Sequence, residues 1–189
     1  MGPIVADMSV SLDGFVADPN DDVNGVFTWY AKPQPDGGAE AEGDETVKTA
    51  VGMRHELGVI VYGRRTFELA NGWGGRHPTG APVVVVSHSV PDGWPRPDGQ
   101  VRFAPGVDEA LAMADAIAPG KIVAIGTPSL VQQLLDRKLL DGVRLSVVPI
   151  LLGRGIRYFD HLGTGPIELD GPIIQAGNGV THLSYAVRR

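Results

Sequence analysis

The sequence predicts an α/β fold built on a mainly parallel sheet. Between residues 59 and 138, apolar runs typical of strands alternate with helical periods, the order that builds parallel sheets. The valines at 83–86 form a continuous apolar run, as in strands that helices cover on both faces. Near the C-terminus, Asn178-Gly179 is a strong hairpin signal between two apolar runs. We therefore expect the sheet to finish in an antiparallel hairpin.

The first third of the chain is expected to contain one strand and one helix. Alternating apolar residues predict a strand over 4–12, and the polar stretch from Asp13 to Gly25 predicts a loop. The stretch 32–43, rich in proline and glycine, is expected to be the most mobile region. Asp44 is a candidate N-cap for a helix over 44–57. Beyond it we expect strands at 59–62, 82–87, 101–103, 121–125, 142–148, 167–176 and 181–188, and helices at 64–70, 107–118 and 128–138.

Length and composition predict a single globular domain over 1–189, with 43% hydrophobic and 20% charged residues. The net charge of −6, with no basic run, argues against nucleic acid as the main partner. No apolar run is long enough to span a bilayer, and the N-terminus lacks a secretory pattern, so we expect no membrane partner and a cytoplasmic location.

The sequence lacks the residues and motifs that several kinds of chemistry require. The chain has no cysteine, which excludes disulfides, thiolate nucleophiles and cysteine-ligated zinc. Its five histidines show no close metal-ligand spacing, so we expect no metal site. No Gly-x-Ser-x-Gly elbow supports serine hydrolysis. Gly153 and Gly155 do not complete a dinucleotide fingerprint, because Tyr158 stands where the third glycine belongs.

Two segments share one design, an apolar strand, a glycine and then a helix that opens on polar groups. They are 59–68, with the glycine at 63, and 122–130, with the glycine at 126. A helix N-terminus presents unpaired N–H groups and the positive end of the macrodipole, and a preceding glycine lets a phosphate approach the backbone. Two such junctions predict a dinucleotide ligand.

Both junctions also have a plainer interpretation. Arginine in the first turn of a helix is unfavourable by roughly 0.3–1 kcal/mol unless an anion offsets it, so Arg64 and Arg65 favour a phosphate. Alternatively, Arg64 pairs with Glu68 at i,i+4, and Arg65 is a solvated surface charge. At the second junction Thr127 is a candidate cap, followed by proline and a serine donor; alternatively, this is an ordinary capped helix start.

Four motifs in register resemble the dihydrofolate-reductase-like superfamily. They are Ser11-Leu12-Asp13-Gly14-Phe15, residues 62–68, residues 126–130 and residues 149–159. More closely, they resemble the reductase domain of bacterial bifunctional riboflavin-biosynthesis enzymes and its stand-alone relatives, over residues 3–188. The resemblance implies a three-layer fold with helices on both faces of the sheet, NADPH as hydride donor, and a homodimer. The apolar C-terminal strands at 143–152 and 183–187 agree with a homodimer, since they would leave an exposed edge if unpaired.

The resemblance also implies a cofactor site. It places Ser9, Ser11 and Val16 near the nicotinamide. It implies that the adenosine-side phosphates bind to Gly63, Arg64, Arg65 and Thr66, and that the 2′-phosphate binds to Ser87. The residues implied for the pyrophosphate are Gly126, Thr127, Pro128, Ser129 and Leu130. For Ser87, an ordinary loop at a strand end is the alternative interpretation, and Asp13 is expected to form a turn rather than to act in catalysis.

The chain departs from the family where the substrate acid belongs. Val47 stands where folate reductases carry an acid, and the nearby Asp44 and Glu45 are the candidate catalytic acids, with helix capping as their alternative role. We therefore expect an NADPH-dependent reductase of a small heterocyclic (pterin- or pyrimidine-like) or carbonyl substrate, and at best poor activity on dihydrofolate. The alternatives are a non-catalytic nucleotide-binding or regulatory protein, and a phosphosugar-binding domain without nicotinamide.

Overall fold

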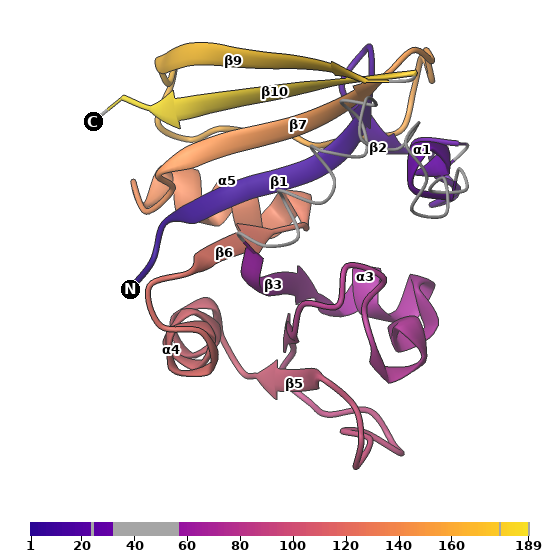
Figure 1. Ribbon diagram of the computed structural model, residues 1–189, viewed down its shortest axis with the longest axis vertical. Helices are drawn as coiled ribbons and strands as arrows, with labels where there is room; N and C mark the ends of the chain where they lie inside the picture. Colours follow the sequence, from indigo (N-terminus) through magenta and orange to yellow (C-terminus); the bar gives the residue numbers. More distant parts are fainter. Residues whose placement is uncertain (24, 32–56, 178, 189) are drawn as a thin grey trace, which may run out of the picture.

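The computed structural model describes residues 1–23, 25–31, 57–177 and 179–188. Its centre is an eight-stranded sheet in the order β5-β4-β3-β6-β1-β7-β10-β9, which runs from bottom to top in Figure 1. The strands are β1 (Ile4–Ser11), β3 (Leu57–Gly63), β4 (Val83–Val86), β5 (Val101–Ala104), β6 (Ile122–Ile125), β7 (Gly142–Val148), β9 (Leu169–Gly177) and β10 (Val180–Val187). The helices are α1 (Thr28–Ala31), α3 (Arg64–Leu69), α4 (Val107–Ile117) and α5 (Pro128–Asp136).

The sheet is parallel from β5 to β7 and antiparallel from β7 to β9. Within the parallel part, β3 pairs with β4 and β6, and β1 pairs with β6 and β7. Strand β10 is antiparallel to both β7 and β9. The mainly parallel sheet and the C-terminal hairpin around positions 178 and 179 are therefore confirmed.

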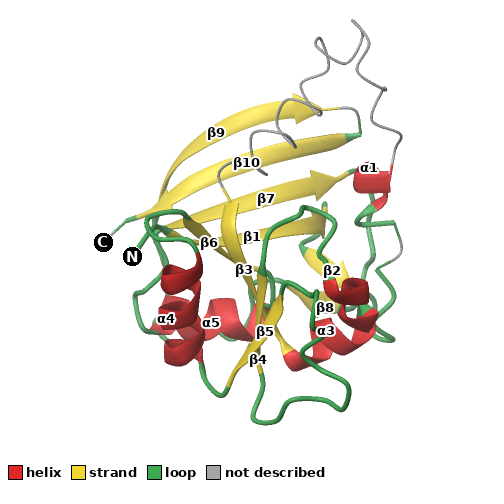
Figure 2. Ribbon diagram, turned by 60° about the horizontal axis from the view of Figure 1, so that its bottom comes forward, coloured by secondary structure: helices red, strands yellow, loops and turns green. Residues whose placement is uncertain are grey.

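Helices lie on both faces of the sheet, as expected. Ala6, Met8 and Val10 of β1 pack with Leu111 of α4 and Leu134 of α5 on one face. On the other face, Phe67 of α3 packs on Val83 and Val85 of β4. Figures 1 and 2 show α1 and α3 at the end of the molecule opposite to the two termini.

The valine run is buried on both faces because its side chains alternate between them. Val84 joins the cluster under α4 and α5, while Val83 and Val85 join the cluster around Phe67. Each of these three valines is fully buried, and burial of such a side chain contributes about 1.5–3 kcal/mol. This packing supports the prediction made from the continuous apolar run.

Some local predictions differ from the structure. Leu57 begins β3 and does not end a helix, while the rest of the expected helix over 44–57 and the stretch 32–43 lie outside the described residues. The expected loop after β1 contains a short strand, β2 (Phe15–Ala17), which pairs with β8 (Ile156–Arg157) in a small second sheet. Strands of two or three residues are too short to show a period. A 3-10 segment, η1 (Asn71–Gly75), follows α3.

The exposed edge of the sheet was expected in the wrong strands. The segments 143–152 and 183–187 supply β7 and β10, which both lie inside the sheet between other strands. The edge strands among the described residues are β5 and β9, and the residues of β9 are all exposed except Gly177. Strand β9 carries two apolar side chains on opposite faces, Ile173 at 70% and Ile174 at 61% exposure. An exposed apolar edge therefore exists, but it is formed by β9, the strand next to β10.

Candidate functional site

The carboxyl ends of the parallel strands meet at one edge of the sheet. Strand β1 ends at Ser11, β3 at Gly63, β4 at Val86 and β6 at Ile125. Helix α3 starts directly after β3, and two residues separate the end of β6 from the start of α5. In open parallel sheets ligands bind at this edge. The sequence-predicted phosphate residues therefore lie at the edge where a ligand is expected.

Thr127 joins the two strand-to-helix junctions. Its hydroxyl accepts a hydrogen bond from the Gly63 N–H at 2.9 Å and lies 2.9 Å from the hydroxyl of Thr66. It does not cap α5, whose first turn has no side-chain cap, so the expectation of a capping role was wrong. The physical reason is a long-range partner that local sequence does not reveal. The two predicted phosphate junctions are consequently in direct contact.

The glycines at the two junctions allow this contact. A Cβ on Gly63 would lie 3.2 Å from Cγ2 of Thr127, which is tight. A Cβ on Gly126 would lie 2.1 Å from the ring of Tyr62, so only glycine fits there. The Gly126 N–H donates to the carbonyl of Val61 at 3.0 Å, which holds the second junction against β3. Both glycines therefore serve close approach of chain segments, because Thr127 and Tyr62 fill the space that a Cβ would need.

Arg64 connects the end of β3 with the end of β4. Its Nε donates to Oε1 of Glu68 at 2.6 Å, which is the i,i+4 pair considered as the alternative. Its Nη1 donates to the Ser87 hydroxyl at 3.1 Å and to the Ser89 carbonyl at 2.9 Å. Arg64 and Ser87, predicted to bind two phosphates of one cofactor, thus lie side by side.

Arg65 forms an ion pair with Asp21, a residue that precedes it by 44 positions. The hydrogen bond to Asp21, and then the charge of that carboxylate, raise the pKa of Arg65. The arginine side chain is 70% exposed, so solvent screens the pair, and such pairs contribute little to stability. The Asp21 side chain is only 14% exposed, so a phosphate that took its place beside Arg65 would leave this carboxylate without its ion-pair partner.

The remaining pyrophosphate residues divide between surface and core. Ser129 is exposed and Pro128 half-buried at the start of α5. Leu130 is buried among the core side chains, and its N–H donates to the Thr127 carbonyl at 3.1 Å. The donors available to a phosphate are thus hydroxyl groups, two guanidinium groups and the uncapped first turn of α5. This donor set fits a phosphorylated cofactor.

The residues predicted near the nicotinamide lie on β1 and β2. Ser9 accepts a hydrogen bond from Nε1 of Trp29 at 2.9 Å. The Ser11 hydroxyl donates to Oδ1 of Asp13 at 2.6 Å and accepts from the Phe15 N–H at 2.9 Å. Both serines and Val16 are buried. The hydroxyl groups of the two serines have partners within the chain.

Asp13 acts as an anchor of the loop that follows β7. Its carboxylate accepts the N–H groups of Leu152 at 3.1 Å and Gly153 at 2.7 Å. The hydrogen bond from the Ser11 hydroxyl, together with these N–H groups, lowers the pKa of Asp13 to about 2. This agrees with the turn-forming role expected from the sequence.

The acid expected on the helix over 44–57 cannot be placed, since Asp44, Glu45 and Val47 lie outside the described residues. Sequence reasoning missed two groups, namely Asp7, two residues before Ser9 on β1, and Tyr158 after β8, which interacts electrostatically with Asp7. The hydroxyl of Tyr158 donates to the Ile125 carbonyl at 2.6 Å. A charged residue inside the apolar run Ile4–Met8 was the available signal for Asp7.

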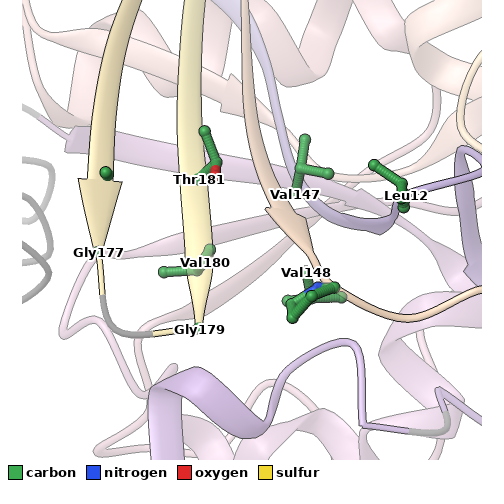
Figure 3. A pocket seen from close by; sticks show the side chains of 9 residues that line it. Leu12, Val147, Val148, Gly177, Gly179, Val180 and Thr181 are labelled. Carbon is green, nitrogen blue, oxygen red and sulfur yellow. The ribbon is translucent and has the colours of Figure 1, made fainter.

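A separate groove of about 270 Å³ lies beside the C-terminal hairpin (Figure 3). Leu12, Val147, Val180 and Thr181 are among its lining residues, and no predicted cofactor residue lines it. Val147 pairs with Thr181, and strand alternation puts both on the face opposite Ser146. None of the described residues that line the groove is charged, so this lining does not suit a phosphate.

Two further findings concern the described residues only. Within them, no helix is long and apolar enough to cross a membrane. In the same ranges, no group of three or more histidine, aspartate or glutamate side chains could hold a metal ion.

Solved structures with the same architecture include three named reductases or riboflavin-pathway proteins. A protein assigned to riboflavin biosynthesis from Shewanella sp. PV-4 is 23% identical with a TM-score of 0.69, each chain being covered to 100%. The diaminohydroxyphosphoribosylaminopyrimidine deaminase/5-amino-6-(5-phosphoribosylamino)uracil reductase of Thermotoga maritima is 14% identical with a TM-score of 0.62, and the match covers 99% of this chain and 57% of that one.

A third solved structure is dihydrofolate reductase of Enterococcus faecalis in complex with NADP(H) and RAB-propyl. It is 15% identical with a TM-score of 0.59, and the match covers 99% of this chain and 97% of that one. No protein-family model and no curated protein matches the chain. Similarity at these identities establishes architecture, and the chain has the fold of the dihydrofolate-reductase-like superfamily.

Proposed function

We propose that the protein is an NADPH-dependent reductase of a small heterocyclic (pterin- or pyrimidine-like) or carbonyl substrate. The observation that carries the proposal is the contact through Thr127, which unites two glycine-led junctions into one site. The fold is shared with a pyrimidine reductase and a dihydrofolate reductase, which supports reduction of a heterocycle. When bound, the nicotinamide would supply a hydride for such a reduction.

In this proposal the site holds the cofactor along the carboxyl edge of the sheet. The first turn of α5 and Thr127 receive the pyrophosphate, while Gly63 and Thr66 lie beside it. Arg64 and Ser87 receive the 2′-phosphate, with Arg65 close in sequence to add charge. Binding would replace the contacts of the arginines with Glu68 and Asp21 by contacts with phosphate. Ser9, Ser11 and Val16 form the wall at the nicotinamide end.

The most direct test is to measure cofactor binding and turnover separately. NADPH binding is followed by nicotinamide fluorescence, and NADPH oxidation is measured with a dihydropterin, a flavin precursor of the aminopyrimidine class and a quinone. We expect tight binding and turnover with at least one acceptor. Binding without turnover would favour the non-catalytic nucleotide-binding alternative, and absence of NADPH binding would reject both.

We also propose that dihydrofolate is a poor substrate. Positioned acid–base groups contribute on the order of 10²–10⁴ in rate, and valine at position 47 can neither orient nor protonate a pterin ring from the position where folate reductases carry an acid. The measurement is kcat/KM for dihydrofolate in the wild type, in Val47→Asp and in Asp44→Asn. Efficient wild-type turnover that Asp44→Asn abolishes would show that the acid lies at Asp44, contrary to this proposal.

A further inference from the structure

Asp7 is an acidic residue in the middle of a buried strand. Its neighbours along β1, Ala6 and Met8, point into the core beneath α4 and α5. Because side chains alternate along a strand, Asp7 points to the other face, the face that it shares with Ser9 and Ser11. Two residues of strand separate Asp7 from Ser9, roughly 6–7 Å. The Asp7 carboxyl group therefore lies on the same face of β1 as Ser9, one side-chain position before it, next to the predicted nicotinamide end.

Asp7 also lies where two parallel strands separate. Strand β1 pairs with β6 as far as Ala6 and Ile125, and then continues beside β7 to Ser11. We call this point the β1/β6 fork. Tyr158 reaches the fork, where its hydroxyl donates to the Ile125 carbonyl at 2.6 Å and interacts electrostatically with Asp7. A fork between parallel strands at their carboxyl ends is a recurrent place for ligands.

The face around Asp7 is polar across several strands. Arg144 of β7 pairs with Asp7 in register, and the next row runs from Ser9 through Ser146 to His182 of β10. Ser146 Oγ lies 2.9 Å from Nδ1 of His182, and both residues are buried. These buried side chains are hydrogen-bonded, Ser9 with Trp29 and Ser146 with His182, as buried polar groups require.

The carboxyl group of Asp7 is in an environment that favours its protonated form. Its Oδ2 atom is enclosed and, within the described part of the chain, has no hydrogen-bond partner. Burial raises the pKa of Asp7 to about 6, and the charge of Arg144 partly opposes this effect. Among the described residues, Arg144 on β7 and Tyr158 at the fork interact electrostatically with Asp7, and His182 on β10 lies in the neighbouring row. Asp7 therefore releases its proton closer to neutral pH than an ordinary aspartate does.

We infer, on the basis of the proposed reductase function, that Asp7 is the proton donor to a substrate with a C=N or C=O bond. Hydride from the reduced nicotinamide adds to the carbon, and the electron pair of the π bond moves to the nitrogen or oxygen. That heteroatom takes the proton of the Asp7 carboxyl group, which becomes a carboxylate and recovers a proton from solvent. The substrate gains two electrons and two hydrogens, and NADPH becomes NADP⁺.

The first experiment measures the pKa of the Asp7 carboxyl group and does not require turnover. Carboxyl ¹³C resonances of the protein are titrated with pH in the free state and with NADP⁺, and Asp7→Asn identifies the signal of Asp7. We expect this carboxyl group to titrate close to pH 6 in both states. Titration at the ordinary value of an aspartate, about 4, would overturn the inference.

The second experiment measures the pH dependence of turnover. With the most active acceptor of the panel, kcat/KM of the wild type should fall as pH rises through about 6, because the protonated acid is required. Asp7→Asn should remove this limb and lower kcat/KM by on the order of 10²–10⁴, with NADPH affinity unchanged. Asp170→Asn removes an exposed carboxyl group at the opposite end of the strands, and should behave as the wild type.

The outcomes separate the inference from the function on which it rests. Wild-type turnover that Asp7→Asn retains, with the same pH limb, overturns the role of Asp7 alone. Absence of turnover by the wild type with every acceptor contradicts the reductase function, and the inference falls with it. A folding defect in Asp7→Asn is detected by circular dichroism, and the wild-type ¹³C titration and pH profile still decide the question.

Discussion

Aspartates at positions 7 and 13 show how surroundings decide the chemistry of one residue type. Asp13 accepts hydrogen bonds from the Ser11 hydroxyl and from the Gly153 and Leu152 N–H groups, which lower its pKa to about 2. Asp7 is half-buried with its Oδ2 atom enclosed, and this desolvation raises its pKa to about 6 against the effect of Arg144. Asp13 is therefore a permanent anion that holds a loop, whereas Asp7 can exchange a proton near neutral pH.

At the residue scale we predict that Asp7 makes folding stability depend on pH. Its pKa in the folded state lies above the ordinary 3.8, so the folded state favours the protonated form. Stability should therefore be lost as pH rises through about 6, by at most about 3 kcal/mol for a shift of about two pKa units. Asp7→Asn should lack this loss.

Urea unfolding of both proteins at about pH 4 and about pH 7.5 tests this prediction. The stability of Asp7→Asn relative to the wild type should increase from the lower to the higher pH. A difference that does not change with pH would show that Asp7 titrates alike in the folded and unfolded chain.

Local sequence revealed some of these residue contacts and not others. The Arg64 to Glu68 pair follows from i,i+4 spacing and was considered from the sequence. The Arg65 to Asp21 pair and the Trp29 to Ser9 hydrogen bond join separate elements, and no local pattern predicts them. Asp7 did leave a signal, since an acid in an apolar strand needs a compensating role.

At the scale of elements, long strands and helices were predictable because their apolar periods span several residues. β3, β4 and β6, and the helices α4 and α5, appear within a few residues of their expected bounds. The small sheet of β2 and β8 was missed because its strands are too short for a period. The capping role of Thr127 was wrong because its hydroxyl bonds to another junction.

We predict that Thr127 couples the two junctions in stability and in cofactor binding. Thr127→Val keeps the shape but removes the bonds to the Gly63 N–H and the Thr66 hydroxyl, which should cost about 1–3 kcal/mol together. Thr127→Ser keeps the hydroxyl and is the matched control. Urea unfolding and NADPH titration measure both effects, and equal behaviour of the two variants would mean that the hydroxyl has no linking role.

At the scale of the whole molecule, the exposed edge of the sheet bears on assembly. Strand β9 presents unpaired backbone groups together with Ile173 and Ile174, which are largely exposed. Exposed apolar edges promote pairing with another chain. We therefore propose that the protein is a homodimer that uses the surface of β9.

Light scattering tests the homodimer. At low micromolar concentration we expect twice the 20.0 kDa of one chain, and Ile173→Lys should shift the mass toward one chain. Val90→Lys places the same charge at another exposed apolar position and should leave the dimer intact. A wild-type mass near 20.0 kDa would contradict the homodimer.

The central claim, an NADPH site at the joined junctions, is tested most directly by calorimetric titration of NADPH and NADH. The wild type should bind NADPH more tightly, because charge-assisted bonds to the 2′-phosphate contribute roughly 1.5–3 kcal/mol. Replacing Arg64 and Arg65 together by alanine should weaken NADPH binding by about 10- to 100-fold and NADH binding far less. Arg137→Ala, which removes an exposed arginine at the far end of α5, is the control. Equal losses for the two cofactors, or no binding of either by the wild type, would contradict the account.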